Sequence, residues 1–243
     1  MKIGVKTFEY REDFKQLAKD IDFIEIMAIE GKDYSKFKEF NLPILVHAQH
    51  EIFLINNANK NLFEKNKSSI NFAIKLANLF NSDKIIVHPG LLSDENCSFE
   101  NAISFFNNFN DKRILIENMP DLKIKKQLCT PVDETKIFLK KVNKGFCLDI
   151  NHAAIGCLDS RQRYVKKIKD FLKLNPSHYH LGGQRLNNDS HLSIEDSEID
   201  LQGIINLLPE NAEITLETTT DLEKIKRDIK LLRGMIVVKN NRK

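Results

Sequence analysis

Hydrophobic residues along the chain form short runs rich in β-branched side chains, and each run is followed by a longer segment with apolar residues three or four positions apart. The short runs predict buried β-strands, and the longer spacing predicts amphipathic helices. The predicted strands are Lys2–Thr7, Phe23–Ala28, Ile44–Ala48, Lys84–His88, Arg113–Glu117, Gly145–Ile150, His178–Leu181 and Glu213–Glu217. The predicted helices are Asp13–Lys19, Tyr34–Phe40, Ser68–Phe80, Phe99–Phe109, Asp133–Val142, Arg161–Leu174, Leu201–Leu208 and Asp221–Arg233.

The alternation of strand and helix predicts the fold class. Eight strand–helix units in 243 residues indicate an α/β protein with a single (β/α)₈ TIM barrel domain over residues 1–243. A doubly wound open sheet is the competing arrangement, but it often carries a glycine-rich phosphate-binding turn after its first strand. The segment Gly4–Asp13 contains no such turn, and no part of the chain has the composition of a linker.

Composition excludes several classes of protein. The 37 Lys and Arg residues against 34 Asp and Glu residues give a formal net charge of +3, which permits a phosphate-bearing partner without requiring one. The N-terminus is charged, and no run approaches the roughly 20 apolar residues of a membrane span, so we expect a cytoplasmic protein that does not bind a membrane. The four cysteines are scattered without a CxxC pair, which argues against disulfides and thiolate zinc sites.

Histidines and carboxylates stand at the ends of six predicted strands. In a (β/α)₈ barrel the C-terminal ends of the strands form the active-site face, so these side chains are expected to converge on one mouth. They are His47, His88, Glu117, Asp149, His180 and Glu217.

Two further segments add ligands of the same type. His152 follows Asp149 by three residues, and Asp189 and His191 form an alternating pair in a polar loop. Imidazoles and carboxylates gathered in this way make metal sites that accept zinc, manganese or iron. Taken singly, each residue has an ordinary explanation, such as a histidine bonded to backbone or a carboxylate paired with a lysine. Their number at one mouth favours a metal site.

The order of these residues resembles that of the endonuclease IV branch of the xylose isomerase-like barrels. The resemblance spans Leu45 to Thr218, and its more specific pieces are VHPG, IEN, CLDINHA and LET. It implies a cluster of up to three divalent ions, zinc by preference. The implied ligands are His47, His88, Glu117, Asp149, His152, His180, Asp189, His191 and Glu217.

The chain departs from the family pattern in three places. His180-Leu-Gly-Gly-Gln184 and Glu195-Asp196-Ser197 replace the segments that the family usually shows there. The first histidine is also ambiguous, because alignment on the strand ILVH selects His47 and alignment on Phe53-Leu-Ile-Asn56 selects His50. We prefer His47, since the strand fixes its direction.

The resemblance implies a metal-dependent hydrolase acting on duplex DNA at abasic sites. Glu117 would bridge two ions, and Asp149 and Glu217 would hold or orient the attacking hydroxide. Phe53 and Leu54 would be wedges that enter the base stack, as apolar residues do in other DNA-distorting proteins. Packing of these two residues within a helix is the competing interpretation.

A sugar or sugar phosphate isomerase or epimerase of the same superfamily is the alternative. Such an enzyme needs one ion, which Glu117, Asp149, His180 and Glu217 could hold, while two carboxylates move a proton between adjacent carbons. The additional pair His47 and His88 favours the nuclease. The modest net charge and the short chain argue against it, because DNA affinity depends on many phosphate contacts and the chain has little room for long loops that bind DNA. The sequence does not indicate an oligomeric state.

Overall fold

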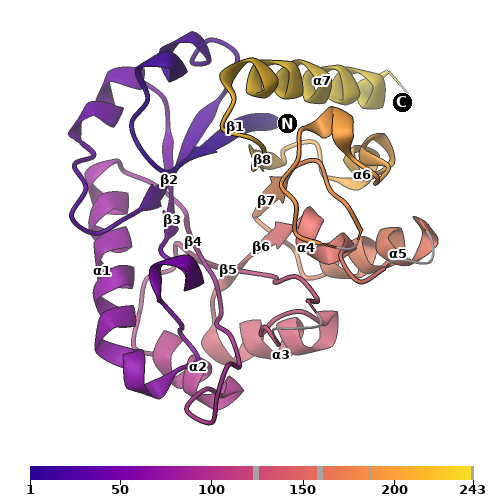
Figure 1. Ribbon diagram of the computed structural model, residues 1–243. Helices are drawn as coiled ribbons and strands as arrows, with labels where there is room; N and C mark the ends of the chain where they lie inside the picture. The colour runs from indigo at the N-terminus through magenta and orange to yellow at the C-terminus, as the bar shows by residue number, and fades with distance from the viewer. Residues whose placement is uncertain (123–125, 158–160, 187, 242–243) are drawn as a thin grey trace.

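The structure, a computed structural model, describes residues 1–122, 126–157, 161–186 and 188–241. Eight parallel strands pair in chain order, and the last strand pairs with the first to close a barrel. Figure 1 shows the strands at the centre with helices around them. The predicted (β/α)₈ barrel is confirmed. The strands are β1 (Lys2–Thr7), β2 (Phe23–Ala28), β3 (Ile44–Ala48), β4 (Ile85–Val87), β5 (Ile114–Glu117), β6 (Gly145–Asp149), β7 (His178–Leu181) and β8 (Glu213–Leu216).

The helices fall in the segments between strands, as the apolar spacing predicts. Among the described residues, none of them combines the length and apolarity needed to cross a membrane. The α-helices are α1 (Phe63–Leu79), α2 (Phe99–Phe106), α3 (Val132–Val142), α4 (Ile150–Ala154), α5 (Arg161–Leu172), α6 (Leu201–Leu207) and α7 (Leu222–Asn240). The 3₁₀ helices are η1 (Glu12–Gln16), η2 (Ser35–Phe40), η3 (Glu51–Phe53), η4 (Lys60–Leu62) and η5 (Ile194–Asp196).

The first two strand–helix units carry 3₁₀ helices where the sequence predicts longer regular ones. In η2 the buried residues Phe37 and Phe40 are three positions apart, which matches the three-residue turn of a 3₁₀ helix. Asn41 then ends the helix in the left-handed conformation with φ of 51°. At the other end of the chain, α7 continues past the predicted Arg233, because the buried row that includes Leu232 extends to Ile236.

Side chains alternate along each strand between the barrel interior and the surrounding helices. Paired residues of neighbouring parallel strands point the same way, so Lys6 with Glu25 and Met27 with His47 lie on one face. On the later strands, the residues that point into the barrel in the same way are those that the sequence predicts at strand ends. Below them, inside the barrel, three residues form a small apolar cluster separate from the main core, namely Ile86, Leu115 and Cys147.

The main core lies between the barrel and the helices. It contains aromatic side chains from many segments, including Phe14, Phe106 and Phe138, all fully or nearly fully buried. Burying such a side chain stabilises the fold by roughly 1.5–3 kcal/mol relative to leaving it exposed. This large shell fixes the strands, and the strands in turn fix the direction of the polar side chains at their ends.

Candidate metal centre

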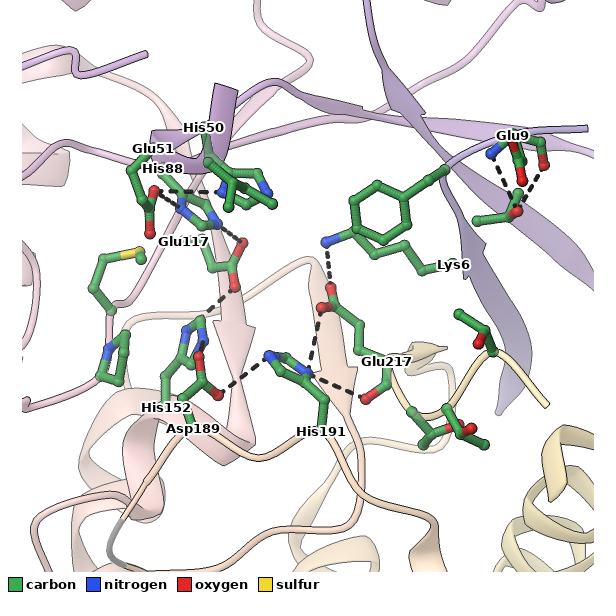
Figure 2. A pocket seen from close by; sticks show the side chains of 18 of the residues that line it. Lys6, Glu9, His50, Glu51, His88, Glu117, His152, Asp189, His191 and Glu217 are labelled. Atoms are coloured by element: carbon green, nitrogen blue, oxygen red, sulfur yellow. Dashed lines mark hydrogen bonds and ion pairs between the residues drawn. The ribbon is translucent and has the colours of Figure 1, made fainter. Parts of the chain in front are cut away.

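The polar strand-end residues meet at one mouth of the barrel. His47 and Asp149 belong to strands, while His88 and Glu217 follow β4 and β8 by one residue each. All the described residues that the sequence singles out as ligands lie in this cluster. Figure 2 shows those that line the cavity, namely His88, Glu117, His152, Asp189, His191 and Glu217. The predicted convergence is therefore observed, because parallel strands in a closed barrel end on the same side.

Glu117 lies at the centre of the cluster. Its Oε2 lies 3.3 Å from His47 Nε2 and 3.4 Å from His88 Nε2. Its Oε1 lies 3.3 Å from His152 Nδ1 and 3.4 Å from His180 Nδ1. Burial alone would raise the pKa of Glu117, but the neighbouring His180 and His88 outweigh burial and hold that pKa well below its ordinary value. An ionised carboxylate with imidazoles at both oxygens has the geometry of a bridging ligand.

Among the described residues, possible ligand atoms gather at this mouth in five compact sets, three of which consist only of residues predicted as ligands. Within each set the atoms lie within 4.8 Å of one another, which is the span expected of ligands that share one ion. The three sets of predicted ligands are His47, His88 and Glu117; Glu117, Asp149 and His180; and His152, Asp189 and His191. The other two sets are Glu25, His47, His180 and Glu217, and His50, Glu51 and His88. Glu217 joins the second set, because its Oε1 lies 2.7 Å from His180 Nδ1.

The histidines are held by one nitrogen and leave the other facing the cluster. His47 Nδ1 donates to the carbonyl oxygen of Ala48 at 2.8 Å, and His152 Nδ1 donates to that of Asn118 at 2.8 Å. Such a hydrogen bond fixes the tautomer and leaves the second nitrogen with a lone pair, as metal-binding histidines require. The donor set of neutral imidazoles and carboxylates fits zinc and related divalent ions.

The loops after β5 and β6 hold Asp149 in place. Asn118 Nδ2 donates to the carbonyl oxygen of Asp149 at 2.9 Å, and Asn118 Oδ1 accepts from the Asp149 amide at 2.8 Å. The Asp149 side chain also caps α4 by accepting from the His152 amide at 2.7 Å. Burial raises the pKa of Asp149 to about 6, with His152 opposing and Glu117 adding to the shift.

The glycines after His180 explain one departure from the family pattern. A side chain at Gly182 would meet the carbonyl oxygen of Glu217 at 2.4 Å, and one at Gly183 would meet that of Ser193 at 1.9 Å. Gly183 exchanges two backbone hydrogen bonds of 2.8 Å with Leu192. The close approach of these backbones positions the loop that carries Asp189 and His191.

The third set is the most open part of the cluster. His191 Nε2 lies 3.2 Å from Asp189 Oδ1, and His152 Nε2 lies 3.5 Å from Asp189 Oδ2. His191 adopts the left-handed conformation with φ of 40°, and its Nδ1 lies 3.2 Å from the carbonyl oxygen of Glu217. About a third of its side chain is exposed. An ion at this set would therefore be reachable from the solvent.

His47 and His50 occupy different places. His47 is fully buried beside Glu117, whereas His50 lies at the rim with its ring 4.5 Å from that of His88. His50 Nδ1 lies 3.4 Å from Glu51 Oε2, and that oxygen also lies 3.0 Å from His88 Nδ1. The arrangement places His47, the residue selected by the strand, next to the central carboxylate.

Three charged residues near the cluster were not predicted from the sequence. Glu51 contacts His88, as described, and Glu25 lies fully buried inside the barrel. Lys6 Nζ lies 2.8 Å from Glu217 Oε1 and 3.9 Å from Glu25 Oε1. Burial would lower the pKa of Lys6, but Glu217 and Glu25 outweigh burial and raise it. The signal that could have found Glu25 and Lys6 is their inward parity, since Glu25 lies in the body of β2 and Lys6, like His47, is the penultimate residue of its strand.

A cavity of about 670 Å³ opens above the cluster and takes in Lys6, Glu117, His191 and Glu217. Phe8 and other apolar side chains line its outer part. His47, Asp149 and His180 lie beneath the cavity, where they are no more than 1% exposed. A substrate in the cavity would thus meet carboxylates and imidazoles below and apolar side chains above.

Comparison with known proteins places this chain in a family. The sequence model of the xylose isomerase-like TIM barrel family matches residues 2–235. The chain is 29% identical over 197 residues to "Probable endonuclease 4" of Halothermothrix orenii, which covers 70% of this chain and 68% of the relative.

Solved structures show the same fold. A D-tagatose 3-epimerase-like protein matches with a TM-score of 0.82 and 20% identity, covering 100% of this chain and 99% of that one. Endonuclease IV from Thermus thermophilus matches with a TM-score of 0.70 and 17% identity, covering 97% and 99%. The resemblance seen in the sequence motifs is confirmed: the chain belongs to the xylose isomerase-like TIM barrel family.

Proposed function

We propose that the chain, as a single barrel domain over residues 1–243, is a metal-dependent phosphodiesterase that hydrolyses DNA at abasic sites. The observation that carries the proposal is the convergence of three ligand sets around Glu117. Two imidazoles, from His47 and His88, meet Glu117 Oε2, whereas His180 meets Glu117 Oε1. A second set of this kind has a use in a multi-ion centre and none in an enzyme with a single ion.

The three sets would hold up to three divalent ions, with zinc preferred by the donor chemistry. Glu117 is proposed as the shared ligand of the first two sets, Glu217 as a ligand of the second, and Asp189 as the carboxylate of the third. Bound ions would activate water near neutral pH and neutralise the charge that develops at phosphorus and on the leaving oxygen.

Asp149 and Glu217 are proposed to orient the attacking water. The Asn118 side chain holds the Asp149 backbone, and the His152 amide donates to one oxygen of the Asp149 side chain. The other oxygen therefore keeps a fixed direction. Glu217 is held by Lys6 at 2.8 Å. Carboxylates fixed in this way align a nucleophile without reorganising during the reaction.

The rim of the cavity offers an apolar element for DNA. Leu54 is 72% exposed and Ile52 is 65% exposed, so Leu54 does not pack within a helix. Leu54 also adopts a left-handed conformation with φ of 59°, which a bulky side chain rarely does without cause. Phe53 is half-buried and packs edge-on against His50 at 5.6 Å. We propose Leu54 as the wedge that enters the base stack, with Phe53 supporting it.

A sugar or sugar phosphate epimerase is the second candidate. It is supported by the compact set of Glu117, Asp149, His180 and Glu217, which is sufficient for one ion. The ion pair between Lys6 and Glu217 argues against it, because an epimerase needs carboxylates that take up and release a proton. An ammonium group 2.8 Å away favours the ionised form of Glu217 and opposes that exchange.

The proposal is tested by incubating metal-loaded protein with duplex DNA that contains one abasic site. We expect strand cleavage by the wild type, loss of cleavage in Glu117→Gln and unchanged cleavage in Glu39→Gln, a control on the protein surface. Metal analysis of the same preparations should give about three ions per chain. A wild type that holds a single ion, leaves abasic DNA intact and epimerises sugars would establish the second candidate instead.

A further inference from the structure

Glu25 is a buried carboxylate in the body of β2. Its neighbours in the strand are apolar, and its side chain is fully buried inside the barrel, at the level of Lys6 on β1. Burying an ionised carboxylate is unfavourable by several kcal/mol unless it is paired and hydrogen-bonded. The ionised form of Glu25 therefore requires hydrogen-bonding or charged partners inside the barrel.

One oxygen of Glu25 collects three contacts. Thr215 Oγ1 donates to Glu25 Oε2 at 2.7 Å, and His178 Nε2 lies 3.2 Å from the same oxygen. The third contact is His180 Nε2 at 3.1 Å. Glu25 Oε1 has no hydrogen-bond partner among the described residues, although Lys6 Nζ lies 3.9 Å away. The carboxylate thus directs one oxygen entirely toward β7 and β8.

The contact with His180 determines which nitrogen of that ring faces the ligands. When an ion is bound at Nδ1, a carboxylate acceptor at Nε2 holds the single ring proton there and keeps the Nδ1 lone pair directed at the ion. His180 Nδ1 lies 2.7 Å from Glu217 Oε1 and 3.4 Å from Glu117 Oε1, the oxygens of two proposed ligands. The ring is fully buried, so water cannot take the place of Glu25.

We infer that Glu25 is a positioning residue for the metal centre, which holds His180 in the tautomer and direction that an ion bound with Glu117 and Glu217 requires. The inference rests on the proposed function only in so far as that function includes the metal centre. The rings of His47 and His152 are held in the same way by hydrogen bonds to backbone carbonyl oxygens. The ring of His180 is held by a carboxylate, which also makes the imidazole more basic and hence a stronger ligand.

Glu25→Gln is the substitution that isolates this role, because glutamine keeps the volume and removes the charge. Thr215→Val is the matched control, since it removes a different donor to the same oxygen and leaves the contact with His180. Zinc affinity is measured on metal-free protein by competition with a chromophoric chelator. We expect Glu25→Gln to weaken zinc binding about ten- to a hundredfold. Thr215→Val should stay close to the wild type.

Wild-type zinc affinity and stoichiometry in folded Glu25→Gln would overturn the inference. Where Glu25→Gln fails to fold, nitrogen-15 NMR of the wild-type histidine rings provides the second test. In the zinc-loaded protein we expect the His180 proton on Nε2 and none on Nδ1, and a protonated Nδ1 in that state would overturn the inference equally. Because both readouts concern metal binding and tautomer, a wild type that fails to cleave abasic DNA would refute the proposed function and leave this inference standing.

Discussion

The ion pair between Lys6 and Glu217 allows a quantitative prediction. Lys6→Met removes the ammonium group and keeps a side chain of similar length. The Lys6 side chain is 9% exposed and that of Glu217 is 11% exposed, so water can reach the lost partner's place only from the cavity. Removing one partner of a buried ion pair destabilises a protein by about 3–5 kcal/mol. For domains of this size that corresponds to a fall in Tm of roughly 6–20 °C.

Lys2 provides a matched control on the same pair of strands. Lys2 Nζ lies 2.7 Å from Glu213 Oε1, so its ion pair is as short as that of Lys6, but its side chain is 62% exposed. Exposed pairs contribute about 0–1 kcal/mol, and we expect Lys2→Met to lower the Tm by no more than about 4 °C. Both variants are compared with the wild type by urea unfolding and calorimetry of metal-free protein.

Zinc should reduce the difference in the free energy of unfolding between Lys6→Met and the wild type. An ion bound by Glu217 supplies a positive charge in the same place, and a ligand at about 100 times its Kd stabilises the folded state by about 2.7 kcal/mol. Equal losses of stability in Lys6→Met and Lys2→Met would refute the reasoning, because burial is the property that separates the two pairs.

Three further predictions concern the rim of the site. His47→Gln should weaken zinc binding in a chelator competition more than His50→Gln, because His47 Nε2 lies 3.3 Å from the central carboxylate; the opposite order would assign the first ligand position to His50. Leu54→Gly should raise the free energy of unfolding by about 1 kcal/mol by relieving the left-handed conformation, and should weaken binding to abasic duplex DNA in fluorescence anisotropy. Unchanged DNA affinity would contradict the wedge. The third is a pH dependence of the metal-free protein. Burial lowers the pKa of His88, but Glu51 and the central carboxylate outweigh burial and raise it from 6.5 to about 9. This stabilisation is fully present below pH 6.5 and should be lost as the pH rises through about 9, which urea titrations across that range would detect.

Most of the fold was predictable because each strand is a short apolar run and each helix has its own spacing. The predicted bounds of β1, β2, β3 and β7 are the observed ones, and the other strands are shorter by one residue at one or both ends. The segment of η2 was predicted as a helix, but a spacing of three residues between Phe37 and Phe40 fits a 3₁₀ helix as well as an α-helix. Packing against the barrel decides between the two.

The ligand candidates were predictable because the ends of parallel strands meet. Glu25 and Lys6 were missed because they lie within strands, where only their shared inward parity reveals them. Glu51 was missed for a different reason. Its position depends on the turn after His50, in which Leu54 takes a left-handed conformation that no local residue preference predicts. That turn brings the Glu51 carboxylate to His88 at 3.0 Å.

The free nitrogens of the histidines give the strongest argument for a centre with several ions. Each of five rings has one nitrogen bonded to an outer acceptor, which is a backbone carbonyl or a carboxylate outside the ligand set. The remaining nitrogens point to three places, with His47 and His88 facing Glu117 Oε2, His180 facing Glu217 and Glu117 Oε1, and His152 and His191 facing Asp189.

A single-ion epimerase would use only the nitrogen of His180. The four others would then have only their contacts of 3.2–3.5 Å with the carboxylates Glu117 and Asp189, and no ion to bind. Divalent ions at the first and third sets would satisfy all four and would also neutralise the carboxylates Glu117 and Asp189. Together with an ion at the second set, these ions suit a phosphodiester, whose reaction develops charge on both the attacking and the leaving side. The arrangement of the nitrogens therefore supports phosphodiester hydrolysis over movement of a proton on a sugar.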